Sequence, residues 1–312
     1  MTRALLLLSL VALLAAPVAA AGDLGASINE RADGGRAPRF YRLDLPRPQP
    51  DGPAQRIVSL APVVTETLFA LGLGERVVGV TRYCDRPEAA RALPKVGGYV
   101  DPQVERVLAL KPDLVVAMPS FGQRAALDRL RERGVPVLVV FGDSLDEVKA
   151  MIRAVSDAAG EAGAGTALVR RMEQDLARVA SSFPEGTHRP RAVLVFQVEP
   201  LVIAGPATFP DEALRLAGGR PAVPRNSPAW PVWSLEALLF LSPDALVAAE
   251  GPKAAQRLRA KLAAAPGGKR PPRVVSSDHA ILMRPGPHLA EDVAALAALL
   301  HPEKSAGTKR AR

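Results

Sequence analysis

Two glutamates in this chain of 312 residues each begin nearly the same phrase. Glu105 opens "ERVLALKPDLVVA" and Glu236 opens "EALLFLSPDALVAA". Each phrase predicts a helix, a Pro-Asp corner and a buried strand, because proline ends a helix and aspartate can hydrogen-bond a turn. This structure does not require the leading acid, although a helix dipole favours one in its first turn. Two interpretations of the paired carboxylates follow: local stabilisation of each helix, or a role outside the fold itself.

Residues that could ligate a metal are few and scattered. The chain has one cysteine, Cys84, and four histidines, His188, His279, His288 and His301. Their spacing matches no zinc site, so we expect no resident metal and no transport of bare zinc or manganese. A metal inside an organic chelator is a different case, because the chelator brings its own donors. His279 or Cys84 could then be an axial ligand, or simply a structural residue.

The sequence also lacks motifs of catalysis. It contains no G-x-S-x-G nucleophile elbow, and segments such as "AGPATFP" lack the glycine pattern that cradles phosphate. An exported hydrolase therefore has no support, and we predict no enzymatic activity and no cofactor. A structural or signalling domain remains as a third class.

The first residues predict export. Residues 1–21 contain one early charge, Arg3, then an apolar run and three alanines, which is the pattern of a cleaved signal peptide. No cysteine lies near this site, so we expect a periplasmic chain without a lipid anchor. A net charge of +8 would suit nucleic acid in a cytoplasmic protein, but export argues against that partner. Segments 22–55 and 302–312 concentrate basic residues and are predicted to be poorly ordered.

The rest of the chain divides into two α/β lobes joined by a helical segment. Residues 56–142 and 190–301 alternate short apolar runs with amphipathic stretches, which predicts parallel sheets covered by helices. Residues 143–183 have helical periodicity and no strand signal, with glycines that we expect to kink the helix (Gly160, Gly163 and Gly165). The predicted fold is two Rossmann-like α/β lobes on a long backbone helix. One copy of the repeated phrase lies in each lobe, and a ligand cleft lies between them.

This plan and several phrases resemble one family, the substrate-binding proteins of ABC importers that have a rigid helical backbone (class III). The phrases are "RIVSLAPVVTETLFALG", "LPKVGGYVDPQVERVLALKPDLVVA", "WPVWSLEALLFLSPDALV" and "SSDHAILMRPGPHL", in an order that covers residues 56–300. The resemblance, strongest to the cobalamin-binding members, implies a monomeric, extracytoplasmic protein that captures cobalamin or a related corrinoid. It would deliver this ligand to a dimeric ABC importer permease. Haem or a ferric siderophore is the alternative metal-chelate ligand.

The resemblance also implies which residues meet the ligand. Aromatic residues at the positions of Tyr83, Tyr99 and Trp230 contact the ligand in the cobalamin-binding relatives, and aromatic faces suit a large flat macrocycle. Met118 stands where those relatives have another aromatic residue, which weakens the case for cobalamin. If the ligand is haem, Tyr83 or Tyr99 is the better candidate for its axial ligand.

Polar contacts are implied for the last loop before the final helix. Asp278 could accept hydrogen bonds from corrin amides, and Arg284 could donate to amides, a phosphate or a carboxylate. Arg284 could instead form a salt bridge that fixes the loop, and His288 stands where the family often has a second arginine. The family also implies a role for Glu105 and Glu236, as surface acids that dock onto arginines of the two permease subunits, one from each lobe.

Overall fold

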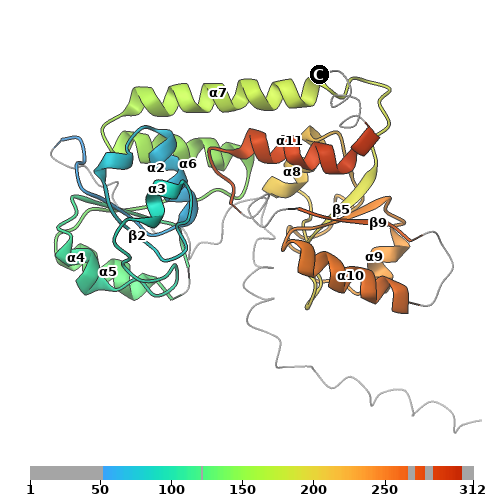
Figure 1. Cartoon of the computed structure of the whole chain (residues 1–312), viewed down its shortest axis with the longest axis horizontal. Helices are drawn as coiled ribbons and strands as arrows, with labels where there is room; N and C mark the ends of the chain where they lie inside the picture. Colours follow the sequence, from blue (N-terminus) through green and yellow to red (C-terminus); the bar gives the residue numbers. More distant parts are fainter. Residues whose placement is uncertain (1–51, 121, 266–270, 278–283, 304–312) are drawn as a thin grey trace, which may run out of the picture.

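The computed structural model describes residues 52–120, 122–265, 271–277 and 284–303. Two lobes lie side by side and are bridged along one edge by helices (Figure 1). The predicted signal peptide, nearly all of the predicted linker, Asp278, His279 and most of the basic tail lie outside the described residues. Within the described part of the chain, no helix combines the length and apolar character needed to cross a membrane.

The N-terminal lobe is built on a sheet of four parallel strands in the order β2-β1-β3-β4. The strands are β1 (Ile57–Ser59), β2 (Val77–Val80), β3 (Leu114–Ala117) and β4 (Val137–Val139). The helices around it are α2 (Pro62–Ala70), α3 (Glu88–Arg91), α4 (Val104–Ala109), α5 (Arg124–Glu132) and α6 (Leu145–Ala158), with a 3-10 turn over Gly74–Arg76. Alternate strand residues pack against α2 and α6 on one face and against α4 and α5 on the other.

The C-terminal lobe has a sheet in the order β6-β5-β8-β9, with β7 paired to β5. Its strands are β5 (Arg191–Gln197), β6 (Val202–Ile203), β7 (Arg220–Pro221), β8 (Ala245–Ala248) and β9 (Arg273–Ser276). All pairs are parallel except β5 with β6, which form an antiparallel hairpin across Glu199-Pro200. The helices are α8 (Phe209–Leu216), α9 (Leu235–Phe240), α10 (Pro252–Ala264) and α11 (Leu289–Leu300).

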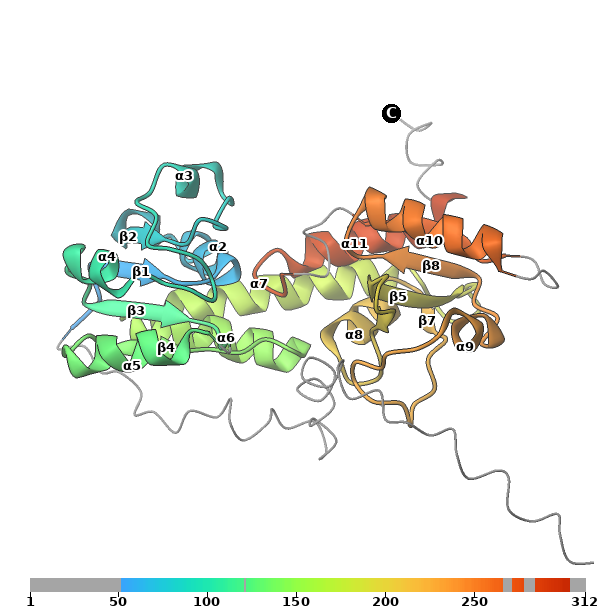
Figure 2. The ribbon, with the colours of Figure 1, turned by 90° about the horizontal axis from the view of Figure 1, so that it is seen from below.

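The predicted backbone helix is two helices, α6 and α7 (Ala162–Ser181), separated by a turn. Gly160 makes this turn in the left-handed region, with φ of 77°. Gly165 then lets α7 approach α6, since a Cβ there would collide with Ser156, whose hydroxyl accepts a hydrogen bond from the Gly165 N–H. As a result, α6 packs on the N-terminal lobe and meets the other lobe at its start, where the Leu145 N–H donates to Glu212 Oε2 of α8 at 2.8 Å. Helix α7, about 30 Å long at 1.5 Å per residue, runs on to the C-terminal lobe (Figure 2).

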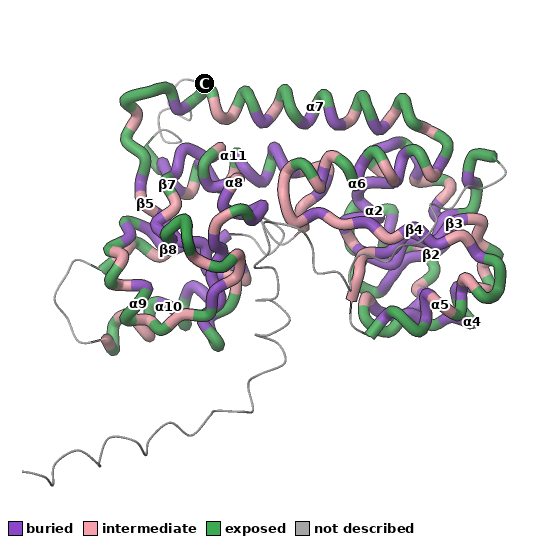
Figure 3. Tube along the Cα trace, turned by 180° about the vertical axis from the view of Figure 1, so that it is seen from behind, coloured by how far each residue is buried: buried purple, intermediate pink, exposed green. Residues whose placement is uncertain are grey.

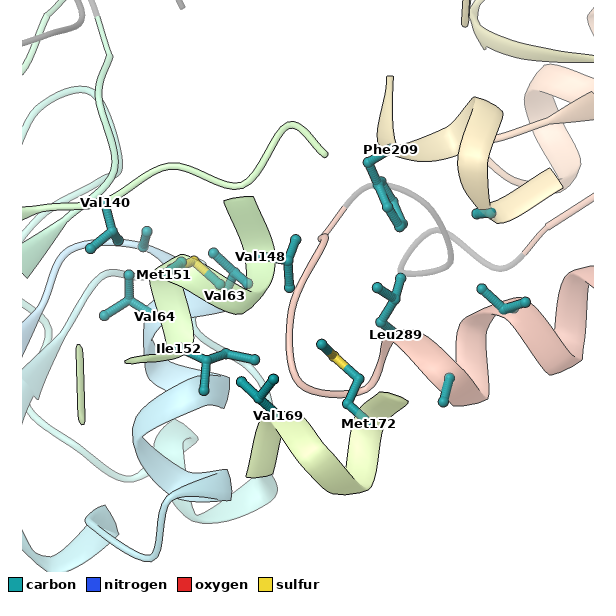
Figure 4. Packing of buried hydrophobic residues seen from close by; sticks show 14 of the residues in the cluster. Val63, Val64, Val140, Val148, Met151, Ile152, Val169, Met172, Phe209 and Leu289 are labelled. Carbon is teal, nitrogen blue, oxygen red and sulfur yellow. The ribbon is translucent and has the colours of Figure 1, made fainter. Parts of the chain in front are cut away.

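One buried apolar cluster runs through both lobes. It joins Val63 of α2 to Val169 and Met172 of α7, and it continues to Phe209 of α8 and Leu289 of α11 (Figure 4). The outward face of α7 remains exposed, while the strands at the centre of each lobe are buried (Figure 3). The lobes are therefore joined by packed side chains as well as by the chain itself.

Both copies of the repeated phrase form the predicted unit of helix, corner and fully buried strand, α4–β3 and α9–β8. Each corner aspartate accepts a hydrogen bond from the backbone N–H that precedes or begins a neighbouring strand. Asp113 accepts from Arg56 at 2.9 Å, and Asp244 accepts from Arg191 at 2.7 Å. The aspartates thus bond a neighbouring strand rather than only their own turn. These hydrogen bonds explain why Pro-Asp is repeated in the two lobes. Neither Glu105 nor Glu236 takes part in them.

Candidate functional site

Three of the predicted ligand residues lie at the edge of the cluster that the lobes share. Tyr99 and Met118 of the N-terminal lobe and Trp230 of the C-terminal lobe are all partly buried and pack against that cluster. Each of the three is therefore neither fully buried nor fully exposed, as is common for residues that line apolar binding sites. The sequence separation of Met118 and Trp230 shows that the fold, not the local sequence, brings them to one core.

A hydrogen bond holds the Tyr99 side chain against Pro119, the residue that follows Met118. The Tyr99 hydroxyl donates to the Pro119 carbonyl oxygen at 2.8 Å, and Gln123 Nε2 donates to the Tyr99 carbonyl oxygen at 2.8 Å. Because its hydroxyl is engaged, Tyr99 is poorly suited to ligate iron, although its ring can still form a wall of a binding site. The arrangement fits the stacking role better than the axial-ligand role.

Tyr83 differs from Tyr99 because it is exposed. It follows β2 and is 50% exposed. The guanidinium carbon of Arg82 lies 5.1 Å from the centre of the Tyr83 ring, and Arg82 in turn pairs with Asp101 at 3.0 Å. A cation over one face orients the ring. Tyr83 is therefore the more exposed of the two tyrosines, although its side chain also hydrogen-bonds Arg82.

Trp230 is fixed on the C-terminal lobe by its ring and by its loop. Its ring meets Phe196 edge-on, with centroids 4.6 Å apart. The Gly205 N–H donates to the Ala229 carbonyl oxygen at 2.7 Å, which ties the Trp230 loop to the end of β6. This loop lies so close to Gly205 that a Cβ at that position would collide with the Pro228 carbonyl oxygen.

We expect Gly205→Ala to displace the Trp230 loop. The added methyl has no flexible side chain to push aside, since the neighbouring atoms are backbone. Ligand affinity should fall about tenfold and the protein should lose about 1–3 kcal/mol of stability, the usual cost of overpacking. Calorimetry and thermal unfolding measure both quantities. Gly163→Ala on α7, where a Cβ meets open space, is the matched control. It should leave affinity unchanged and raise stability by up to about 1 kcal/mol, because alanine favours a helix over glycine. Equal behaviour of the two variants would contradict the expectation.

Arg284 forms the salt bridge that the sequence allowed as an alternative to ligand contact. Its Nη1 lies 3.1 Å from Glu66 Oε1 and 2.6 Å from Asp85 Oδ1. Arg284 enters from the C-terminal lobe after β9, whereas Glu66 lies on α2 and Asp85 follows Tyr83. Gly286 packs against Val63 of α2, where a Cβ would collide with the valine. The segment before α11 thus crosses to the N-terminal lobe and is fixed there by an ion pair.

Sequence reasoning missed three acids around this crossing. Glu66 is 2% exposed and Asp292 is 8% exposed, while Asp85 is exposed. Burial raises the pKa of Glu66, although Arg284 acts against it, and burial raises the pKa of Asp292 to about 7. The hydrogen bond from Arg284 lowers the pKa of Asp85. Glutamate inside the apolar run "VVTETLFALG" was a signal that this acid is buried, and buried acids need partners.

Glu105 and Glu236 are exposed in the first turns of α4 and α9. Glu105 lies 4.0 Å from Arg129, which is a weak surface contact. Hydrogen bonds from its own backbone N–H and from Ser234 lower the pKa of Glu236. Phe240, one turn after Glu236, is 85% exposed and was also missed by the sequence analysis.

The remaining candidates for metal binding find structural roles or lie outside the described residues. Cys84 is buried, and its sulfur lies 3.1 Å from the Thr81 hydroxyl, so it is not presented to a ligand. His288 lies 3.7 Å from Glu291. Across the described residues, no group of three His, Cys, Asp or Glu side chains is placed to hold a metal ion.

Comparison with known proteins places these observations in a family. A family model described as periplasmic binding protein matches residues 57–267. The vitamin B12-binding protein of Vibrio parahaemolyticus is 27% identical over 194 residues, which are 62% of this chain and 70% of that one. An uncharacterised ABC transporter substrate-binding lipoprotein of Bacillus subtilis is 31% identical over 255 residues, covering 80% of this chain and 81% of the other.

Among solved structures, the periplasmic heme-binding protein of Roseiflexus sp. RS-1 in its apo form has a TM-score of 0.69 and 28% identity. The match covers 80% of this chain and 98% of that one. The fold of two α/β lobes on a connecting helix is thus confirmed, as is the prediction that the chain is not an enzyme. The chain belongs to the periplasmic binding protein family, a family of binding proteins.

Proposed function

We propose that this protein binds a corrinoid such as cobalamin outside the cytoplasm and delivers it to an ABC importer. The observation that carries the proposal is that Tyr99, Met118 and Trp230, from two lobes, all lie at the edge of one shared apolar cluster. A flat macrocycle between the lobes would contact these side chains on its edges and faces. Relatives named for vitamin B12 binding support a corrinoid in particular.

Haem is the second candidate ligand, and one observation favours it. Tyr83 presents an exposed phenol, which is a possible axial ligand of haem iron, and a solved relative is named for heme binding. Met118 suits either macrocycle, because its thioether adapts to flat apolar surfaces. A ferric siderophore remains the third ligand of this group.

The proposed delivery uses the two exposed acids. Glu105 and Glu236 occupy the same place in the two copies of one structural unit, so they can meet a permease that has two-fold symmetry. An exposed valine precedes each acid, Val100 at 51% and Val232 at 48% exposure. Phe240 lies four residues after Glu236 on the same helix, so their side chains share one face. Each proposed docking patch thus combines a carboxylate with apolar surface, as transient interfaces do.

The proposal includes export by a signal peptide over residues 1–21 and a mature chain without a lipid anchor. The lobes would then be residues 56–142 and 190–301, with segment 143–183 between them. Amino-terminal sequencing of the exported protein tests this division, since cleavage after about residue 21 is expected from the position of the three alanines.

Titration calorimetry of the purified protein with cobalamin, cobinamide, haem and a ferric siderophore tests the ligand. We expect heat and a rise in melting temperature with the corrinoids, because a ligand of the folded state stabilises it. Trp230→Ala should weaken binding by about tenfold or more, as loss of a buried aromatic contact does. Phe240→Ala removes an exposed aromatic from α9 and should bind normally. If both corrinoids leave heat and melting temperature unchanged, the corrinoid proposal is wrong.

A further inference from the structure

We propose that Asp85 is a selectivity residue that occupies Arg284 and thereby biases the binding site toward ligands without acidic groups. This inference rests on the proposed function, since it concerns the same site. Its basis is the ion pair between Arg284 Nη1 and Asp85 Oδ1, which are 2.6 Å apart. Asp85 lies two residues after Tyr83, a predicted ligand residue.

Arg284 has two carboxylate partners that differ in accessibility. The Glu66 side chain is 2% exposed and lies on α2, so it forms a fixed buried partner. The Asp85 side chain is 53% exposed and belongs to the same loop as Tyr83, two residues further along the chain. Arg91 Nε donates to the Asp85 carbonyl oxygen at 3.0 Å, which holds the backbone in place. Glu66 therefore anchors the guanidinium, while Asp85 covers it.

The surroundings leave little positive charge for an anionic ligand. Glu66 and Asp85 offset Arg284, and further charged groups act on this cluster, namely Arg86, His288, Glu291 and Asp292. The three arginines, Arg284, Arg86 and Arg91, are thus matched by at least as many carboxylates. A ligand carboxylate that takes the place of Asp85 on Arg284 Nη1 exchanges one charge-assisted hydrogen bond for another with no net gain, and one that binds another guanidinium nitrogen lies beside the Asp85 charge.

A ligand whose rim carries amides avoids this competition. Amides can accept from Arg284 or donate to Asp85 without breaking the ion pair. A ligand with two propionates, such as haem, lacks donors for Asp85 and places like charges beside it. The Arg284–Asp85 ion pair therefore attracts ligands that carry amides and repels ligands that carry carboxylates. Specific sites commonly reject close analogues by such repulsion.

Asp85→Asn tests the inference with two forms of one macrocycle, haem and its dimethyl ester, which differ only in the acidic groups. Binding of each is followed by absorbance titration, with cobinamide as a third probe. Asparagine keeps the shape of Asp85 but releases Arg284, so the affinity for haem should rise about tenfold relative to that for the ester. The affinity for cobinamide should change less than about threefold.

Two further variants separate selectivity from a general effect. Asp85→Glu retains the charge and should keep the wild-type ratio of haem to ester affinity. Asp175→Asn removes an aspartate that pairs with an arginine on α7, Arg178 at 2.9 Å, and it should also keep that ratio. An unchanged ratio in Asp85→Asn, or an equal gain for both forms of haem, would overturn the inference alone. Failure of the wild-type protein to bind any of the three probes would overturn the proposed function, and the inference with it.

Discussion

Replacing Glu105 and Glu236 together by lysine should abolish ligand delivery while leaving ligand affinity unchanged. Both side chains are exposed at helix starts, and neither takes part in the hydrogen bonds that fix the Pro-Asp corners. The fold should therefore tolerate the change. Like charges facing each other at an interface cost several kcal/mol, so uptake should fall roughly a hundredfold.

Uptake of labelled ligand into vesicles that contain the partner importer is the measurement, with calorimetry on the same protein as the check of binding. Glu88→Lys with Glu185→Lys is the matched control, because it changes the net charge equally at two other exposed acids. This control should transport normally. If the Glu105 and Glu236 variant also transports normally, the two acids do not dock, and helix stabilisation is the simpler account of them.

The repeated phrase shows why the fold was largely predictable from sequence. Its proline, its aspartate and its apolar run act within a single turn of chain or on the adjacent strand, so local pattern and structure agree. The same holds for the break at Gly160, whose left-handed conformation follows from glycine chemistry. The sequence pattern could not predict that α6 packs mainly on the N-terminal lobe. That placement depends on contacts between α6 and α2, which helical periodicity does not reveal.

The candidate site was less predictable because its contacts are distant in sequence. Arg284 and Glu66 are 218 positions apart, and no periodicity connects them. The sequence could identify Arg284 as a polar residue in a loop, but it could not distinguish a ligand contact from an ion pair. Phe240 was missed for the opposite reason, since an apolar residue in an amphipathic helix is expected to be buried. Its exposure is visible only in the folded protein.

The buried acid Asp292 should make the protein less stable as pH rises from about 4 to about 7. Burial raises the pKa of Asp292 from 3.8 to about 7, with Arg86 acting against this shift and Glu66 and Glu291 adding to it. In that pH range the unfolded chain has lost the proton and the folded protein keeps it, so unfolding becomes more favourable with increasing pH. Above about pH 7 Asp292 is ionised in both the folded and the unfolded protein, and burying its charge then lowers the free energy of unfolding by the full amount.

Asp292→Asn removes this cost, because its amide stays neutral at every pH. At about pH 8.5 the variant should be more stable than the wild type by about 2–4 kcal/mol, and at about pH 4 the two should be nearly equal. Thermal unfolding across the pH range is the measurement. Glu291→Gln, whose side chain is 81% exposed in the same turn of α11, is the control and should show no such trend. A variant that is less stable at both ends of the range would mean that the Asp292 carboxylate is ionised and held by its neighbours, since only a favourable charge would then be lost.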